Sequence, residues 1–505
     1  MFRKWVSVGL LGWAVLTPAW ARQEQKPPPE WASYLAAANN AEQANQDPEQ
    51  RCLAYPDLPG TDWLAGAAKA RCPLLRQPML SLEQMEALLD EPDGAAKLDK
   101  RFSDLLDAHY KDTSQREQIT VTYWVFNADE KPLKIAKRWL QAAPGSVFAK
   151  TALGYVYARQ GWKARGTRLV SETPESNLQR MNERFAAAVP LLAQAIETEK
   201  RMLPACVELA SIGRMSSDRL HESAMAACMK ADPFSYFVVE QAITAAEPRW
   251  GGSDAAMRAM TAYAAAHVDK NPMLNVFLGS AAGEREDLGD DWKLILPGAV
   301  AATLQAPNAH YISRAGHAYR AQQDKWAAVA YLSQALRFRP RDADDLRLRA
   351  GLLNDLGYDD WALPDARLAV ALEPEDGGHE YQLGRSLLFV EGELAARPHF
   401  ERAMKDPGSR QRAYEMWCQT FVTTKDWKQA DSCSAELTEE YPDNAEGWRL
   451  RAFALNALRN PMVSKAMQEF LDHQDLKRWP FHKATAEKFK VILESRPDPA
   501  RAKSL

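Results

Sequence analysis

Two short segments of the sequence concentrate residue types that could bind a ligand. Residues 161–177 and residues 248–253 each contain a tryptophan and an arginine, together with glycines. A pair of arginines beside tryptophan rings could hold a carboxylate or another anion by bidentate hydrogen bonds and stacking. The residues of this candidate loop cluster are Trp162, Arg165, Glu172, Arg249, Trp250 and Ser253.

Three interpretations of the loop cluster remain open. In the structural one, Glu172 and Arg165 form an ion pair that fixes a long loop, and glycines supply the tight backbone geometry. In the second, the arginines and tryptophans line a ligand pocket. The third, catalysis, requires a base beside a nucleophile such as Ser253, and no histidine lies near this serine in the sequence. We therefore assign no catalytic residue.

The histidines and glycines indicate no metal or cofactor site. None of the nine histidines belongs to a His-x-x-x-His pair, and none has the carboxylate spacing typical of metal ligands. The glycines of Asp376-Gly377-Gly378 open a helical repeat, and no strand precedes them, so they do not form a phosphate-binding loop. We predict no metal and no cofactor.

The six cysteines fall into three local pairs: Cys52 with Cys72, Cys206 with Cys228, and Cys418 with Cys433. In each of the last two pairs, one cysteine lies on the first helix of an expected hairpin and the other on the second. Antiparallel helices about 8–10 Å apart bring such positions within reach of a disulfide. In an oxidising compartment we expect all three pairs to be bonded. Buried free thiols are the alternative.

A helical repeat accounts for much of the chain. Alanines recur at Ala328, Ala362, Ala396 and Ala430, and the second helices close at Pro340, Pro374 and Pro442. This period of about 34 residues, with small residues where two helices cross, resembles the tetratricopeptide repeat. The resemblance implies pairs of antiparallel helices stacked into a solenoid. An unrelated helical bundle would not repeat the small residues in register.

Weaker copies extend the array in both directions. We expect further hairpins within residues 154–199, 203–231, 236–267 and 272–304, and a last one after Pro442. Residues 30–145 are helical in pattern without the repeat signature, and residues 119–126 are ambiguous between helix and strand. We therefore predict an all-α protein, a right-handed α-solenoid of tetratricopeptide-like hairpins with an N-terminal helical cap.

The N-terminus has the order of a secretory signal peptide. Arg3 and Lys4 precede an apolar stretch that ends at Leu16, and Ala19-Trp20-Ala21 forms a cleavage site. An uncleaved anchor is the alternative, but the apolar run is shorter than the about 20 residues that a spanning helix requires. We expect cleavage after Ala21, a periplasmic or secreted mature chain, and no later membrane span.

This organisation divides the chain into five parts. They are a signal peptide (1–21), an N-terminal helical region (22–145), a divergent helical-repeat domain with long loops (146–305), tetratricopeptide-like repeats (306–475) and a C-terminal tail (476–505).

Both segments of the loop cluster fall in turns between the first and second helix of a hairpin. Turns of this kind share one edge of a solenoid, and stacked repeats that advance about 10 Å each would separate these two by about 20 Å. The 17 residues from 161 to 177, extended at about 3.3 Å per residue, span that gap. We therefore predict that residues 161–177 fold over residues 248–253.

The same loops resemble a bacterial family catalogued as domain of unknown function 4034. The shared motifs are Gly-Trp-Lys-Ala-Arg-Gly from Gly161, the pair Glu172-Thr173, Arg180-Met181, and Pro-Arg-Trp-Gly-Gly-Ser from Pro248. The resemblance covers about residues 95–275 and implies a helical, repeat-like fold in exported or envelope proteins. It implies no activity, so no functional residue is carried over.

Composition and charge exclude several classes of function. The 505 residues are 46% hydrophobic and 26% charged with a formal charge of −4, so neither a disordered chain nor a nucleic-acid binder is expected. We predict an exported, non-enzymatic scaffold that binds a protein or peptide partner on a helical-repeat groove. The alternative is a small-molecule or glycan-fragment binder, or an enzyme, that uses the loop cluster.

Overall fold

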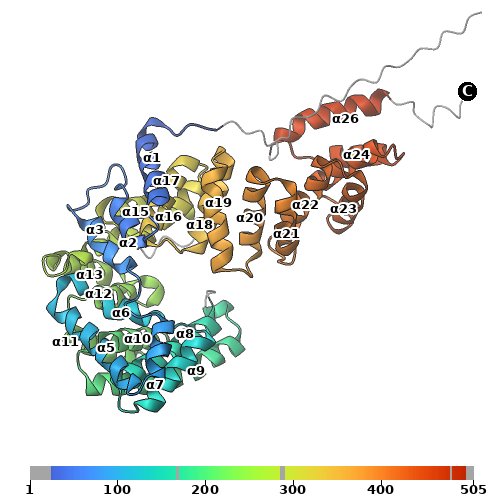
Figure 1. Cartoon of the computed structure of the whole chain (residues 1–505). Helices are drawn as coiled ribbons and strands as arrows, with labels where there is room; N and C mark the ends of the chain where they lie inside the picture. Colours follow the sequence, from blue (N-terminus) through green and yellow to red (C-terminus); the bar gives the residue numbers. More distant parts are fainter. Residues whose placement is uncertain (1–23, 167–169, 285–290, 478–479, 496–505) are drawn as a thin grey trace, which may run out of the picture. The chain divides into compact units, whose positions relative to one another are not determined.

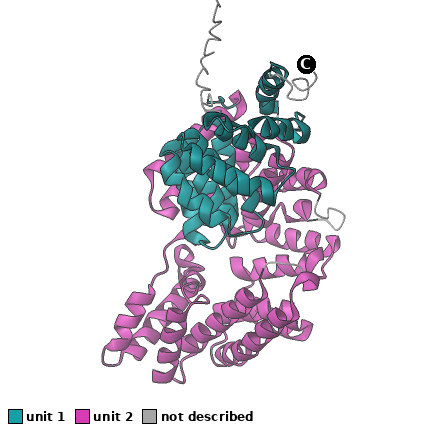
Figure 2. Ribbon diagram, turned by 90° about the vertical axis from the view of Figure 1, so that its right-hand side faces the viewer, with its two compact units in different colours: residues 1–27, 341–505 teal, residues 28–340 magenta. Residues whose placement is uncertain are grey.

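The computed structural model describes residues 24–166, 170–284, 291–477 and 480–495 (Figure 1). The expected signal peptide and its cleavage site lie outside these residues. The chain divides into two compact units: residues 28–340 form one, and residues 1–27 together with 341–505 form the other (Figure 2). No helix in the described part of the chain is both long and apolar enough to cross a bilayer.

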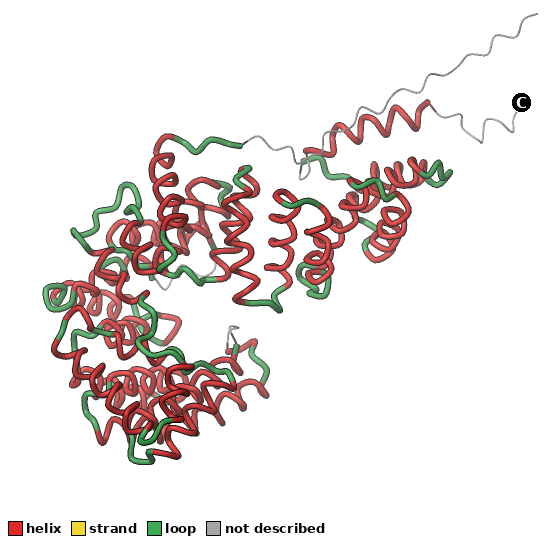
Figure 3. Tube along the Cα trace, viewed as in Figure 1, coloured by secondary structure: helices red, strands yellow, loops and turns green. Residues whose placement is uncertain are grey.

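Every regular element in the described residues is helical, which confirms the predicted all-α fold (Figure 3). Residues 119–126, whose pattern is ambiguous in the sequence, lie largely within α6 (Gln118–Tyr123). All six residues of this helix are buried. The segment therefore lacks the polar face by which a surface helix is recognised in a sequence.

Antiparallel helix pairs form the regular part of the 28–340 unit. They are α8 (Val147–Arg165) with α9 (Glu175–Thr198), α10 (Leu203–Ser216) with α11 (Asp218–Ala231), α12 (Tyr236–Ala246) with α13 (Asp254–Ala266), and α16 (Ala309–Ala321) with α17 (Lys325–Phe338). The two helices of each pair pack on each other, and α10 also packs on α8 and α12. The first helices of three consecutive hairpins therefore form a continuous row.

Residues 272–305 depart from the expected hairpin. The first half consists of η5 (Pro272–Phe277) and the short α14 (Ser280–Gly283), and only the second half is one helix, α15 (Trp292–Gln305). Gly279 and Gly283 within this first half disfavour a single continuous helix, because glycine has low helix propensity.

The helices before α8 extend the array as the predicted cap. They are α4 (Leu82–Asp90), α5 (Gly94–Lys111), η2 (Thr113–Gln115), α6 and α7 (Glu130–Ala142). Both α5 and α7 pack on α8. Their shared core contains Phe102 and Trp139, which are fully buried and have ring centres 5.1 Å apart.

Residues 29–76, which we call the N-terminal strap, pack elsewhere. The strap contains α1 (Pro29–Ala44), α2 (Pro48–Ala54), α3 (Ala67–Arg71) and η1 (Cys72–Leu75). Both α1 and α2 contact α17, and α3 contacts η5. Nε1 of Trp63 donates to the carbonyl of Thr303 at 2.6 Å. The strap therefore packs on the last hairpin of this unit and not over the first (Figure 1).

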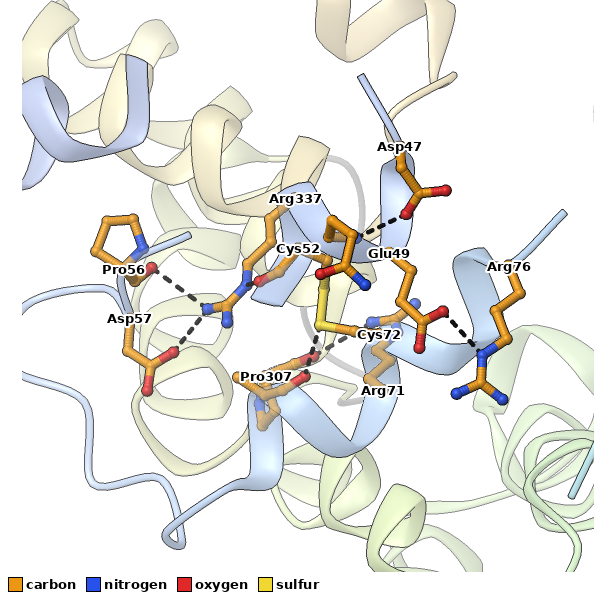
Figure 4. Close-up of a disulfide and its surroundings, with 12 residues drawn as sticks. Asp47, Glu49, Cys52, Pro56, Asp57, Arg71, Cys72, Arg76, Pro307 and Arg337 are labelled. Carbon is orange, nitrogen blue, oxygen red and sulfur yellow. Dashed lines mark hydrogen bonds and ion pairs between the residues drawn. A yellow bond between two sulfur atoms is a disulfide. The ribbon is translucent and has the colours of Figure 1, made fainter. Parts of the chain in front are cut away.

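A buried arginine anchors the strap to α17. Arg337 is 1% exposed. Its Nε donates to the carbonyl of Cys52 at 2.9 Å, and its Nη1 donates to the carboxylate of Asp57 at 2.6 Å (Figure 4). Nη1 also lies 3.3 Å from the carbonyl of Pro56. One guanidinium thus donates hydrogen bonds to two backbone carbonyls and one carboxylate of the strap.

The 341–505 unit consists of four further hairpins and a terminal helix. The pairs are α18 (Ala343–Leu356) with α19 (Asp359–Leu372), α20 (Gly377–Val390) with α21 (Glu393–Ala403), α22 (Arg410–Thr423) with α23 (Trp427–Glu440), and α24 (Ala445–Ala457) with α25 (Val463–His473), followed by η6 (Pro480–His482) and α26 (Lys483–Ser495). The recurring Ala362, Ala396 and Ala430 are 0% exposed. Within the segment that we treat as a C-terminal tail, α26 forms because Phe489 packs 5.4 Å from Phe470.

Candidate functional site

The first segment of the loop cluster is more helical than expected. Helix α8 continues to Arg165, so Gly161 and Trp162 are part of it. A Cβ on Gly161 would lie 2.6 Å from the ring of Phe185, and the ring centres of Trp162 and Phe185 are 5.3 Å apart. The glycine therefore allows α8 and α9 to pack closely. The connection between the two helices begins only after Arg165 and is shorter than expected.

We expect Gly161→Ala to lower the free energy of unfolding by about 1–2 kcal/mol, because the added methyl group displaces Phe185 from its packed position. Chemical denaturation of the full chain measures the change. Gly145→Ala is the matched control, since nothing lies within 4 Å of a Cβ built there. Equal stability of the two variants would contradict a close contact of α8 and α9 at Gly161.

Arg165 and Glu172 lie on the two sides of the shortened loop. Nη1 of Arg165 donates to the carbonyl of Gly166 at 3.0 Å. Glu172 is the last residue of η3 (Val170–Glu172) and is exposed. Residues 167–169, between the two side chains, lie outside the described residues. The ion pair of Arg165 with Glu172 therefore stays a prediction.

The second segment forms a turn that its neighbours hold in place. In η4 (Pro248–Trp250), the side chain of Arg249 forms an ion pair with Glu247. The guanidinium carbon of Arg214, on α10, lies 4.9 Å from the centre of the Trp250 ring. Ser253 caps α13 by accepting a hydrogen bond from the N–H three residues later at 3.2 Å. The meeting of this turn with residues 161–177 stays a prediction.

Four side chains around α10, namely Arg159, Glu208, Arg214 and Trp250, form what we call the α10 polar cluster. The side chain of Glu208 is 4% exposed, and its Oε2 lies 3.1 Å from Nη2 of Arg159. Burial raises the pKa of Glu208, although both arginines favour its charged form. Among the described residues, Glu208 Oε1, Arg214 Nε and Trp250 Nε1 are buried without a hydrogen-bond partner. One acceptor and two donors of the cluster are thus buried and unpaired within the described part of the chain.

The six cysteines are bonded in the three expected pairs. The disulfide of Cys52 with Cys72 links α2 to η1 inside the strap (Figure 4). The other two link α10 to α11 and α22 to α23. The Cα atoms of the pairs are 5.5–5.6 Å apart, which is the usual separation. Three disulfides are typical of a protein from an oxidising compartment.

A cavity of about 250 Å³ lies in the 341–505 unit, and we call it the acidic cavity. Helix α22, the turn before α24, the end of α25 and η6 supply its walls. Its lining consists of four carboxylates, two histidines, two amides, a phenylalanine and an alanine: Glu415, Asp443, Glu446, Asp475, His473, His482, Gln411, Asn444, Phe481 and Ala445.

Two buried groups set the electrostatics of the acidic cavity. Nε2 of His482, which is 2% exposed, lies 3.0 Å from Glu446, and its Nδ1 is buried without a hydrogen-bond partner among the described residues. Burial by itself would raise the pKa of Glu446, but Arg449 and His482 outweigh it and lower that pKa to about 2. Glu446 is therefore ionised at neutral pH.

Glu415, which lines the same cavity from α22, has a different environment. Burial raises its pKa, while the side-chain amide of Asn444 donates to its carboxylate and favours the charged form. A cation in the cavity would favour the ionised form further. The ring of Phe481, with a residue exposure of 60%, adds an aromatic face to which a cation is attracted.

The acidic cavity favours a positively charged ligand of modest size. Its volume is below that of most pockets for small-molecule ligands and suits a single side chain. A lysine ammonium or an arginine guanidinium offers only donors, which match carboxylates and amide oxygens. Among the described residues, the lining contains no serine, threonine, cysteine or lysine.

The acidic cavity is not among the sites predicted from the sequence. The repeat register contains part of the signal, because Glu415 and the start of α24 lie on first helices of adjacent hairpins. His482 lies outside the repeats, and only the packing of η6 brings it to Glu446. A search for acidic residues on the first helices of adjacent hairpins would have found Glu415 on α22 and Glu446 on α24.

No family model matches the chain, and no curated protein matches it, so the resemblance to domain of unknown function 4034 receives no support here.

Several solved structures show a distant similarity to this chain. Yeast Tom70 is 12% identical with a TM-score of 0.32, over 80% of this chain and 99% of that chain. PilW, described as a widely conserved type IV pilus biogenesis factor, is 15% identical with a TM-score of 0.32. The match covers 37% of this chain and 93% of PilW. YrrB, described as a TPR protein with an unusual peptide-binding site, is 18% identical with a TM-score of 0.29. The match covers 33% of this chain and 87% of YrrB. Scores this low carry no functional conclusion, and the fold assignment rests on the helix pairs themselves.

Proposed function

We propose that this protein is an exported, non-enzymatic scaffold that binds a protein or peptide partner, and that the acidic cavity receives a basic side chain of that partner. The observation that supports this proposal most is the cavity itself, which gathers four carboxylates and an exposed phenylalanine. Export is supported by the order of residues 1–21 and by the three disulfides.

The charge of the cavity explains why a basic side chain is the preferred occupant. Four carboxylates face one small volume, in which Arg449 and His482 pair with Glu446, and Nδ1 of His473 lies 3.7 Å from Asp443. Like charges in a shared site repel one another, so a bound cation relieves repulsion and gains charge-assisted hydrogen bonds. The surrounding helices then need only provide a broad surface for the rest of the peptide.

Peptides selected from a random library on the full chain test the proposal. We expect the selected peptides to share a lysine or arginine, and replacement of that residue by norleucine or citrulline to weaken binding at least about tenfold, as expected for a lost charge-assisted contact. Calorimetric titration measures the affinity. Higher salt should weaken binding as well, because it screens the attraction.

The same titration with variants locates the site. Glu415→Gln removes a cavity carboxylate at constant shape and should weaken peptide binding about tenfold. Glu439→Gln, an exposed carboxylate on α23, is the matched control and should change nothing. If Glu415→Gln bound the peptides as the parent does, the acidic cavity would not be the site. If no peptide bound to the parent, the scaffold function itself would be contradicted.

A second candidate function is the binding of a small molecule, such as a glycan fragment, at the α10 polar cluster. The unpartnered Glu208 Oε1, Arg214 Nε and Trp250 Nε1 favour it, because a sugar hydroxyl both donates and accepts. A thermal-shift screen of glycan fragments tests this on the parent and on Trp250→Phe, which keeps the ring and removes the N–H. A shift in the parent that Trp250→Phe reduces would support it, and an equal shift in both would contradict it.

A further inference from the structure

We propose that the turn between α19 and α20 binds a divalent transition-metal ion of the zinc class through Glu373, Asp376 and His379. The ligand atoms of these three side chains lie within 4.8 Å of one another. Nδ1 of His379 is 3.8 Å from Oε2 of Glu373 and 3.8 Å from Oδ1 of Asp376. This site lies apart from the acidic cavity and does not depend on the proposed function.

The environment of His379 is the observation that points to a ligand. Its side chain is 1% exposed, and neither ring nitrogen has a hydrogen-bond partner among the described residues. Buried polar groups are almost always satisfied, so a histidine left in this way requires an additional partner. The atoms nearest to Nδ1 that could share such a partner are the two carboxylate oxygens.

The distances suit a shared ion. Zinc binds histidine nitrogen and carboxylate oxygen at about 2.0–2.2 Å, so two of its ligands lie at most about 4.4 Å apart. Both separations from Nδ1 satisfy this limit. The side chains of Glu373 and Asp376 are 60% and 49% exposed, so both carboxylates are accessible to an ion from solvent. Water would complete the coordination.

The local backbone keeps the three ligands together. Asp376 caps α20 and accepts from the N–H of His379 at 2.9 Å, which holds its carboxylate at the histidine. Gly377 allows this arrangement, because a Cβ there would lie 2.2 Å from Cβ of Asp406. Asp406 adds negative charge to the turn. Arg347, whose Cδ would lie 3.7 Å from a Cβ built on Gly378, directs its guanidinium to Asp344 at 3.2 Å.

The ligand set selects the class of metal. One imidazole and two carboxylates suit zinc and its neighbours, whereas Ca²⁺ and Mg²⁺ prefer oxygen ligands alone. A bound ion would join the end of α19 to the beginning of α20 and so fix one hairpin against the next. Glu373 and His379 each lie three residues from Asp376, and the turn between the two helices contains Pro374. A search for two metal ligands on one face of a single helix therefore does not find this site.

Zinc titration of the chelator-treated full chain tests the proposal. We expect the double variant Glu373→Gln/Asp376→Asn to lose one equivalent of zinc or to bind it at least about tenfold more weakly, and the zinc-dependent rise of the melting temperature to shrink with it. Asparagine caps a helix as well as aspartate does, so the variant should fold. Glu375→Gln, in the same turn, is the control and should bind as the parent does.

Two outcomes would overturn the site. One is a double variant that binds zinc with the stoichiometry and affinity of the parent, since the other histidines would then account for the binding. The other is a parent that binds Ca²⁺ or Mg²⁺ as tightly as zinc, because that would exclude the histidine as a ligand. His379→Gln provides a third measurement, interpreted only if circular dichroism shows the parent's helical content.

Discussion

Replacement of Arg337 by alanine is expected to lower the free energy of opening of the N-terminal strap by about 3 kcal/mol, because each buried acceptor left without its donor costs about 1–3 kcal/mol. The guanidinium is the donor to the carbonyl of Cys52 and to the carboxylate of Asp57. Without it, the carbonyl of Cys52 loses this donor, and the contact of the guanidinium with the ring of Tyr55 in the strap, at 6.0 Å, is lost as well.

Hydrogen exchange of the full chain, followed by mass spectrometry of peptides from residues 29–76, measures this opening. Arg320→Ala, at an exposed position on α16, is the control and should leave the exchange of the strap unchanged. Asp57→Asn should have a smaller effect, since the Asp57 side chain is 58% exposed. Strap exchange in Arg337→Ala equal to that of the parent would contradict the anchoring role.

Removal of the disulfide of Cys52 with Cys72, by substitution of both with alanine, is expected to destabilise the strap by about 3 kcal/mol. The two cysteines are 20 residues apart, and the bond restricts the unfolded loop between them. Both are 0% exposed, so the substitution also removes buried sulfur atoms. The same peptides of residues 29–76 measure the change by exchange.

The matched control removes the disulfide of Cys418 with Cys433, which closes a loop of similar length in the other unit. This variant should destabilise α22 and α23 and leave the strap as it is. If both double variants affected the strap equally, the effect would come from general destabilisation. If neither changed exchange anywhere, the disulfides would contribute little to the folded state.

The sequence alone determined the helical class and the hairpins. Periodicity reports which face of a helix is buried, and small residues report where two helices cross. The alanines spaced about 34 residues apart are therefore buried as expected, and prolines and capping residues mark the ends of helices. These signals are local, since each depends on residues within one hairpin.

The place of the N-terminal strap was decided only by tertiary structure. Arg337 and Cys52 are 285 positions apart, and nothing in the local pattern of either segment specifies the other. The same holds for the acidic cavity, where His482 reaches Glu446 across 36 positions. Gly161 is predicted from the sequence to lie in a loop, because glycine often marks a turn. In the structure it lies inside α8, where the absence of a side chain leaves room for the ring of Phe185. Periodicity identifies buried faces but not their partners, and binding sites arise where partners distant in the sequence pack together.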